Sequence, residues 1–174
     1  MQAFIESDLA QALWQEHLPR FGELPNLELY MDQVVSVINE ALLPLFPHSS
    51  SPILTPTMVN NYVKQKLVPP PVKKRYNRTH LIYLIEVALL KPVFSIAEIN
   101  ALLQLQFQLA TPQQAYDRFC SELEYGLRVM LGSQEPAEPL EPENEVLRAA
   151  VFCLVSKIQV QKHLEFIDSR QKTE

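Results

Sequence analysis

The chain has 174 residues, 47% of them apolar, which suffices for one domain of ordinary size with an additional helical arm. Its three glycines are too few for a glycine-rich phosphate-binding loop or for a strand-rich fold with many tight turns. A formal net charge of −5 would argue mildly against a nucleic-acid partner if it were spread evenly along the chain, but it is not.

The first 26 residues are expected to form an N-terminal extension. Residues 5–17 have the pattern of a short amphipathic helix. Pro19, Gly22 and Pro25 then interrupt the chain before a second helix can begin. No residue of this extension points to a particular chemistry.

A second helix is predicted over residues 27–46, because apolar residues recur there at intervals of three to four. They are Leu27, Met31, Val34, Ile38, Ala41 and Leu45. Residues 47–52 form a loop rich in serine and proline. Thr55 then precedes Pro56 as an N-cap precedes a proline in the first helical position, so a third helix is predicted from Pro56 to just before Pro69.

The third helix is predicted to have an apolar half and a polar half free of acidic residues. Met58, Val59, Tyr62, Val63 and Leu67 share the apolar half, and Lys66 does not fit there. The polar half consists of Thr57, Asn60, Asn61 and Lys64. Pro69, Pro70 and Pro71 then give a stiff extended segment, after which residues 72–77 are expected to form a short β hairpin, or wing.

Four further helices complete the prediction. They run from Asn77 or Thr79 to about Lys91, from Ser95 to about Gln106, from Thr111 to about Leu131, and from Glu145 to about Arg170. The fold class is therefore all-α with a small β wing. We expect a winged helix-turn-helix domain over residues 27–106 and a C-terminal helical region over residues 107–174, with an acidic, proline-rich linker at residues 133–144.

The basic residues are concentrated in one segment. Residues 41–85 contain no Asp or Glu but six Lys or Arg, whereas the rest of the chain has nine basic and twenty acidic residues. Such a segment produces a local positive field that can attract phosphates, because solvent screens charges more than about 10 Å away. The alternative interpretation of this segment is an ordinary solvated basic loop.

These features together favour a protein that binds double-stranded DNA. Reading a duplex requires a helix whose polar side chains bond base edges, with basic groups nearby for the phosphates. The candidate DNA-binding residues are Thr57, Asn60, Asn61, Lys64, Lys73, Lys74, Arg75, Tyr76 and Arg78. Exposed asparagines are nevertheless common on ordinary helix surfaces, so the pair at positions 60 and 61 has a purely structural explanation as well.

The run LTPTMVNNYVKQKLVPPPVKKRYNRTHLIYLIEVALLKPVFSIAEINALL resembles the DNA-binding domain of MerR-type transcriptional regulators. Arg75 and Tyr76 match the end of the wing in that family, and Leu81 matches the leucine that opens its next helix. A later pattern is matched by Phe94, Ser95, Ile96, Glu98 and Ile99. The whole chain also resembles a bacterial family of unknown function related to those regulators. The resemblance to MerR-type regulators implies a winged helix-turn-helix fold and a sequence-specific transcriptional regulator. The resemblance to the family of unknown function is closer and implies a fold but no established ligand or target.

Other functional classes are less well supported. The four histidines and two cysteines lack metal-ligand spacing, no nucleophile motif is present, and we expect no metal, no cofactor and no enzymatic activity. Cys120 and Cys153 lie in apolar helical patterns and are expected to be reduced and buried. The main alternative to DNA binding is a protein-interaction module on the same fold.

The remaining expectations concern location and assembly. The most apolar run, residues 81–90, is too short to span a membrane, and the start of the chain has no secretory signal, so we expect a soluble, cytoplasmic protein. An apolar stripe on the last helix predicts a homodimer. It comprises Val146, Ala149, Ala150, Cys153, Leu154, Ile158, Leu164 and Ile167. Packing of this stripe on Leu123, Leu127 and Met130 of the same chain is the alternative.

Overall fold

The computed structural model describes residues 3–46, 52–137, 139 and 142–171. Within these residues the chain forms seven α-helices and three short 3₁₀ turns, Phe4–Glu6, Phe21–Glu23 and Pro142–Asn144. The helices are α1 Asp8–Trp14, α2 Met31–Leu42, α3 Pro56–Lys64, α4 Arg78–Leu90, α5 Ile96–Leu109, α6 Pro112–Met130 and α7 Glu145–Gln171. The all-α part of the predicted fold class is confirmed.

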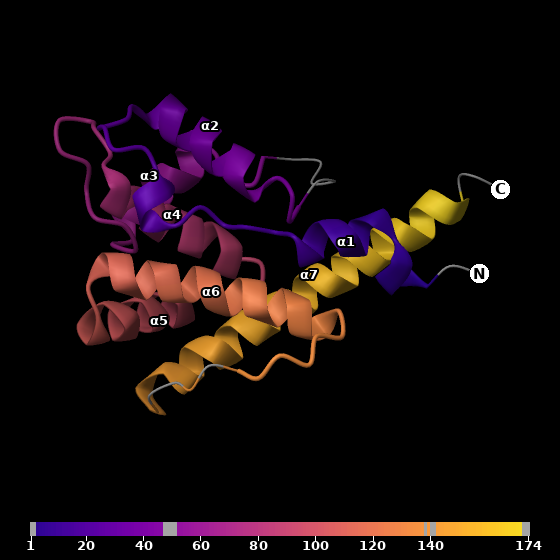
Figure 1. The fold of residues 1–174 in the computed structure, drawn as a ribbon. Coiled ribbons are helices and arrows are strands. Elements are labelled where there is room, and N and C mark those ends of the chain that lie inside the picture. The colour runs from indigo at the N-terminus through magenta and orange to yellow at the C-terminus, as the bar shows by residue number, and fades with distance from the viewer. Residues whose placement is uncertain (1–2, 47–51, 138, 140–141, 172–174) are drawn as a thin grey trace.

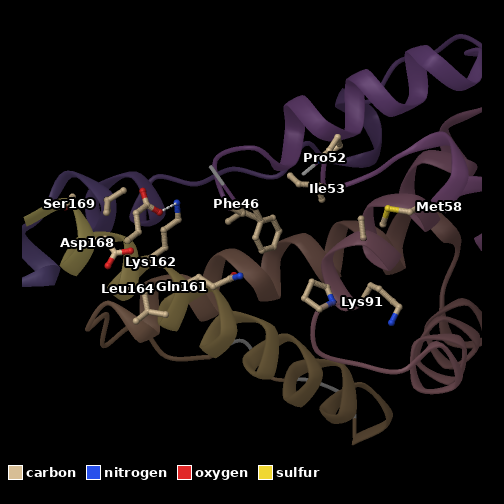
Figure 2. Close-up of a pocket in the computed structure, with 15 residues that line it drawn as sticks. Phe46, Pro52, Ile53, Met58, Lys91, Gln161, Lys162, Leu164, Asp168 and Ser169 are labelled. Carbon is tan, nitrogen blue, oxygen red and sulfur yellow. Dashed lines mark hydrogen bonds and ion pairs between the residues drawn. The ribbon is translucent and has the colours of Figure 1, made fainter. Parts of the chain in front are cut away.

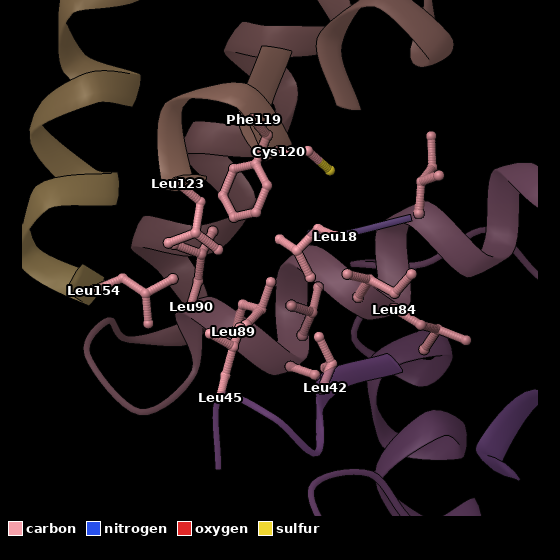
Figure 3. Close-up of a cluster of buried hydrophobic side chains, with 14 of the residues drawn as sticks. Leu18, Leu42, Leu45, Leu84, Leu89, Leu90, Phe119, Cys120, Leu123 and Leu154 are labelled. Atoms are coloured by element: carbon pink, nitrogen blue, oxygen red, sulfur yellow. The ribbon is translucent and has the colours of Figure 1, made fainter. Parts of the chain in front are cut away.

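The helices form a compact group from which one long helix extends. Figure 1 shows α2, α3 and α4 gathered above α5 and α6, while α7 crosses beneath α6 and continues to the far side, where it lies beside α1. Ten of the thirteen residues of α4 are buried, so this helix is the centre of the core. Figure 3 shows Leu90 of α4 next to Leu123 of α6 and Leu154 of α7.

The predicted β wing is wrong, because the described residues contain no β-strand. Val72 and Arg75 form one isolated antiparallel bridge around a two-residue turn, in which Lys73 and Lys74 have φ of 50° and 62°. The pairing cannot extend, because Pro70 and Pro71 have no N–H to donate to a second strand. Tyr76 instead pairs with Leu29, each N–H donating to the other's carbonyl oxygen at 2.8 to 2.9 Å. We call residues 72–75 the basic turn.

The bridge to Tyr76 also explains why α2 begins at Met31 and not near Leu27 as predicted. Leu29 is in extended conformation because it pairs with a residue far away in the sequence. Tyr30 then takes the N-cap position, and its N–H donates to the Gln33 side chain at 2.9 Å. Leu27, assigned by its spacing to the buried face, is 65% exposed.

α3 ends at Lys64, earlier than predicted, because the chain closes it with a Schellman motif. The Leu67 N–H donates to the Tyr62 carbonyl oxygen at 2.9 Å, and the Lys66 N–H to that of Val63 at 3.0 Å. Lys66 lies in the left-handed region with φ of 60° and is exposed. Its poor fit to the apolar face is therefore explained, since it lies beyond the end of the helix.

The Schellman motif leads to a stability prediction. Lys66→Gly removes the cost of holding a side chain at positive φ and is expected to raise the free energy of unfolding by about 1 kcal/mol. Lys64→Gly removes the same charge from a position inside the helix. This control variant is expected to lower the free energy of unfolding by about the same amount. Urea denaturation of both variants measures the two changes, and a destabilised Lys66→Gly variant would contradict the motif.

α7 packs on α6 through part of the stripe that was predicted for it. Ala150, Leu154 and Ile158 are buried against the same chain. The helices approach closely at Gly126, where an added Cβ would lie 2.9 Å from the Val155 side chain. Val146, Ala149, Leu164 and Ile167 remain exposed. Cys120 is buried as predicted, but the burial predicted for Cys153 is wrong because it lies on the exposed side of α7.

Parts of two predicted connections lie outside the described residues: most of the 47–52 loop, and residues 138, 140 and 141 of the 133–144 linker. In the part of the chain that is described, none of the helices has the length and apolar character that crossing a membrane requires.

Candidate nucleic-acid interface

α3 is held at both ends and on its inner face. The Thr55 hydroxyl caps it by accepting from the Met58 N–H at 3.2 Å, and Pro56 occupies the first turn. Val59 and Tyr62 are buried. All four residues predicted for its polar face, Thr57, Asn60, Asn61 and Lys64, are exposed to solvent.

Asn39 of α2, which sequence reasoning missed, fixes the chain just before α3. Its side-chain N–H groups donate to the carbonyl oxygens of Leu54 and Val35, both at 2.8 Å, and its Oδ1 accepts from the Leu54 N–H at 3.0 Å. This pairing fixes the position of α3 relative to α2. The sequence did contain a signal for this role, because the polar Asn39 lies at helical spacing from Val35 and next to Ile38.

The basic turn presents Lys73 and Lys74 to solvent, and both are exposed. Arg75 is partly buried, with its guanidinium carbon 3.6 Å from the centre of the Tyr30 ring, a cation–π contact that connects the turn to the start of α2. Arg75 therefore helps to hold the turn in place, while the two lysines are its outward-facing charges.

Two other predicted DNA-binding residues take part in the packing around the turn. Tyr76 is 3% exposed. Arg78 donates through Nε to the Leu24 carbonyl oxygen at 2.8 Å and through Nη2 to that of Gly22 at 3.3 Å, which connects α4 to the N-terminal extension. The side chains of the predicted set that face solvent are thus those of α3 together with Lys73 and Lys74.

His80 connects the proline segment to α4. The ring is buried, and its Nε2 lies 3.3 Å from the Pro70 carbonyl oxygen. Its Nδ1 lies 2.7 Å from the side-chain oxygen of Asn77. The same Asn77 oxygen caps α4 by accepting from the backbone N–H of His80 at 3.2 Å. His80 thereby ties the end of the extended segment to the helix that follows the basic turn.

A groove of about 1050 Å³ runs beside α3 toward the C-terminal half of α7. Figure 2 shows Phe46, Ile53 and Met58 along one part of it and Lys162 at the opposite end. Lys162 Nζ lies 3.4 Å from Glu165 Oε2, and burial lowers the pKa of the lysine. Since Met58 belongs to α3, a partner seated in the groove would touch the helix that carries Asn61.

Glu86 of α4 is a further buried polar group, which sequence reasoning placed in an apolar run without assigning it a role. It is fully buried, and desolvation raises its pKa to about 8. Its Oε2 accepts from Gln106 Nε2 at 3.1 Å, whereas among the described residues the Oε1 atoms of both side chains have no hydrogen-bond partner. A protonated Glu86 can donate a hydrogen bond, so the neutral acid suits this site better than the carboxylate.

The described residues contain no group of three or more His, Cys, Asp or Glu side chains that could hold a metal ion. The candidate interface consists of the exposed polar side chains of α3 together with Lys73 and Lys74.

One comparison with known proteins identifies a family. Residues 19–119, more than half of the chain, match the model of a domain of unknown function, DUF1836. The chain belongs to the DUF1836 family. This is compatible with the predicted family of unknown function, whereas nothing in the comparisons supports the resemblance to MerR-type regulators. No curated protein and no solved structure matches the chain. The DUF1836 match includes α2, α3, the basic turn, α4 and α5.

Proposed function

We propose that this DUF1836 protein is a cytoplasmic, sequence-specific DNA-binding regulator of transcription that acts as a homodimer and has no catalytic activity. The observation that carries the proposal is the exposed polar face of α3. This helix lies within residues 41–85, a segment that contains six basic residues and no acidic residue. Amide side chains on a short helix can bond base edges in the major groove, and basic groups nearby can bind phosphates. In this proposal α3 reads the sequence and the basic turn binds the backbone.

Asn61 is the residue of α3 that we assign to base recognition. A carboxamide can bond N6 and N7 of adenine together, so its loss affects the preferred sequence selectively. Asn61→Ala is expected to weaken binding to the preferred DNA site by about 1 to 3 kcal/mol. The affinity for random-sequence DNA and the salt dependence of binding should stay almost unchanged. The site is first selected from random duplexes with the wild-type protein, and both proteins are then titrated against it.

Asn39→Ala provides the contrast for Asn61→Ala, because the partly buried Asn39 side chain bonds the backbone before α3 and so positions that helix. It is expected to lower the melting temperature, whereas Asn61→Ala leaves it at the wild-type value. If the folded Asn61→Ala variant kept full affinity for the preferred site, Asn61 would not be a base-contacting residue.

A second candidate function, a protein-interaction module, is favoured by the groove beside α3. Its apolar part, which includes Leu45, Phe46, Ile53 and Met58, has the character of a surface that a protein partner covers. The two functions differ in their response to salt, because phosphate binding weakens steeply with ionic strength. A titration with duplex DNA therefore distinguishes them.

A further inference from the structure

The bridge between Leu29 and Tyr76 brings two further side chains together. In an antiparallel pair, the residue that follows one partner lies opposite the residue that precedes the other, so Tyr30 lies opposite Arg75. The Arg75 guanidinium carbon is 3.6 Å from the centre of the Tyr30 ring, which is the contact distance of two flat groups. The guanidinium therefore lies against the face of the ring, and its N–H groups point beyond the edge of the ring.

The N–H donors of the Arg75 guanidinium have no acceptor within the part of the chain that the structure describes. No oxygen of these residues accepts a hydrogen bond from the guanidinium, which contacts the Tyr30 ring instead. Glu28 and Asp32 lie close to Tyr30 in the sequence, but neither forms an ion pair with Arg75. The Arg75 side chain is partly exposed and Tyr30 is 52% exposed, so a ligand can reach the pair.

Two other arginines show how a guanidinium of this protein binds an oxyanion. Arg20 donates to both carboxylate oxygens of Glu124, at 2.7 and 2.6 Å. Arg148 donates to both carboxylate oxygens of Glu122, at 2.7 and 2.8 Å. A planar guanidinium binds a phosphate group by the same pair of hydrogen bonds. Arg75 offers this geometry to an oxyanion from outside the chain.

The surroundings of Arg75 favour a phosphate of a nucleic acid as that oxyanion. Lys73 and Lys74 precede it on the basic turn and are exposed, so three successive residues carry positive charge. Closely spaced positive charges match the closely spaced phosphates of a duplex, whereas a single carboxylate would leave the two lysines unpaired. Because the Tyr30 ring already restricts the guanidinium, less conformational entropy is lost when a phosphate binds.

We propose that Tyr30 is a positioning residue for DNA binding, which holds the guanidinium of Arg75 so that it donates two hydrogen bonds to one backbone phosphate. The inference rests on the proposed function and adds to it a residue outside α3 and the basic turn. The Tyr30 ring is available for this role because Tyr30 caps α2 through its backbone N–H, which donates to the Gln33 side chain at 2.9 Å. Tyr30 acts through Arg75 and makes no contact of its own with the DNA.

A double-mutant cycle tests whether Tyr30 acts through Arg75. Tyr30→Leu removes the ring and is expected to lower the affinity for duplex DNA about two- to fivefold. Arg75→Gln removes the guanidinium and is expected to lower the affinity about tenfold at 0.1 M salt. The double variant should bind as Arg75→Gln alone does, since the ring then has no guanidinium to hold. On a Lys73→Ala background, Tyr30→Leu should keep its full effect.

The salt dependence and a conservative variant distinguish positioning from a merely structural role. Arg75→Gln should lower the slope of log K against log salt by about 0.9, whereas Tyr30→Leu, which keeps every charge, should leave the slope near the wild-type value. Tyr30→Phe keeps the ring and should bind as the wild type does. Equal losses in Tyr30→Phe and Tyr30→Leu, or additive losses in the double variant, would overturn the proposal. Melting temperatures show whether each variant is folded.

The same titrations distinguish failure of this inference from failure of the proposed function. If the wild type bound duplex DNA and Tyr30→Leu bound it equally well, only the role of Tyr30 would be wrong. If the wild type did not bind duplex DNA at low salt, both would be overturned. Titration with poly-glutamate tests the choice of oxyanion. Binding as tight as that to duplex DNA, and weakened equally by Arg75→Gln, would assign the guanidinium to carboxylates and overturn the proposal.

Discussion

Replacing Lys73 and Lys74 with alanine is expected to lower the affinity for duplex DNA by on the order of ten- to a hundredfold at 0.1 M salt, whatever its sequence. Both side chains are exposed at the tip of the basic turn, where positive φ at two successive residues reverses the direction of the chain. Phosphate binding is independent of sequence, so the affinity for specific duplexes and the affinity for random duplexes should fall together. The slope of log K against log salt should fall by about 0.9 for each phosphate that the variant no longer neutralises.

The matched control for this double variant is Lys91→Ala with Lys157→Ala, two exposed lysines that lie just after α4 and on α7. It changes the net charge equally, so a similar fall in affinity in both variants would assign the effect to overall charge and not to the turn. Arg75 is left intact because its cation–π interaction with Tyr30 supports the turn. Fluorescence anisotropy over a range of salt concentrations gives both the affinity and the slope.

Glu86→Gln is expected to have the largest effect on stability, and that effect depends on pH. Burial raises the pKa of Glu86 to about 8, whereas an unfolded glutamate titrates near 4.5. Between these values the folded protein holds a proton that the unfolded chain has released. The stability contributed by the neutral acid is therefore complete below about pH 4.5 and is lost as the pH rises through about 8.

Glutamine has the shape of the neutral acid but cannot ionise, and its amide can pair with that of Gln106. The variant is therefore expected to be more stable than wild type by about 2 to 4 kcal/mol at pH 9, with a small difference near pH 5. Denaturation at a series of pH values measures this difference, with exposed Glu28→Gln as the control. If wild type and Glu86→Gln had parallel stability profiles from pH 5 to 9, Glu86 would not titrate as described.

Most helices could be predicted from the sequence because their ends depend on local chemistry. Thr55 before Pro56, Ser95 with Glu98, and Thr111 before Pro112 all cap helices in the structure. The β wing was predicted wrongly for two reasons. Pro70 and Pro71, which the sequence does show, prevent the turn from extending into strands. The pairing of Tyr76 with Leu29 is long-range, and local chemistry does not indicate it. The same pairing moved the start of α2.

For the candidate site, the sequence correctly indicated that Thr57, Asn60, Asn61 and Lys64 are exposed, because burial on a helix follows its period. Residue type alone could not show that Arg78 is engaged by backbone carbonyl groups of the N-terminal extension. Periodicity also failed for α7, where inner and outer apolar residues form a single stripe in sequence but lie on two faces in the structure. A single helical period assigns the apolar residues of a helix to one face, so it does not describe a long helix with apolar residues on two faces.

The central claim, that α3 and the basic turn form a DNA-binding surface, is tested most directly by titrating the wild-type protein with duplex DNA from low to moderate salt. Lys64, Lys66, Lys73 and Lys74 are exposed around this surface. If these lysines neutralise about four phosphates, a plot of log K against log salt has a slope of about −3 to −4. Absence of binding at low salt, or binding that does not change with salt, would contradict this claim.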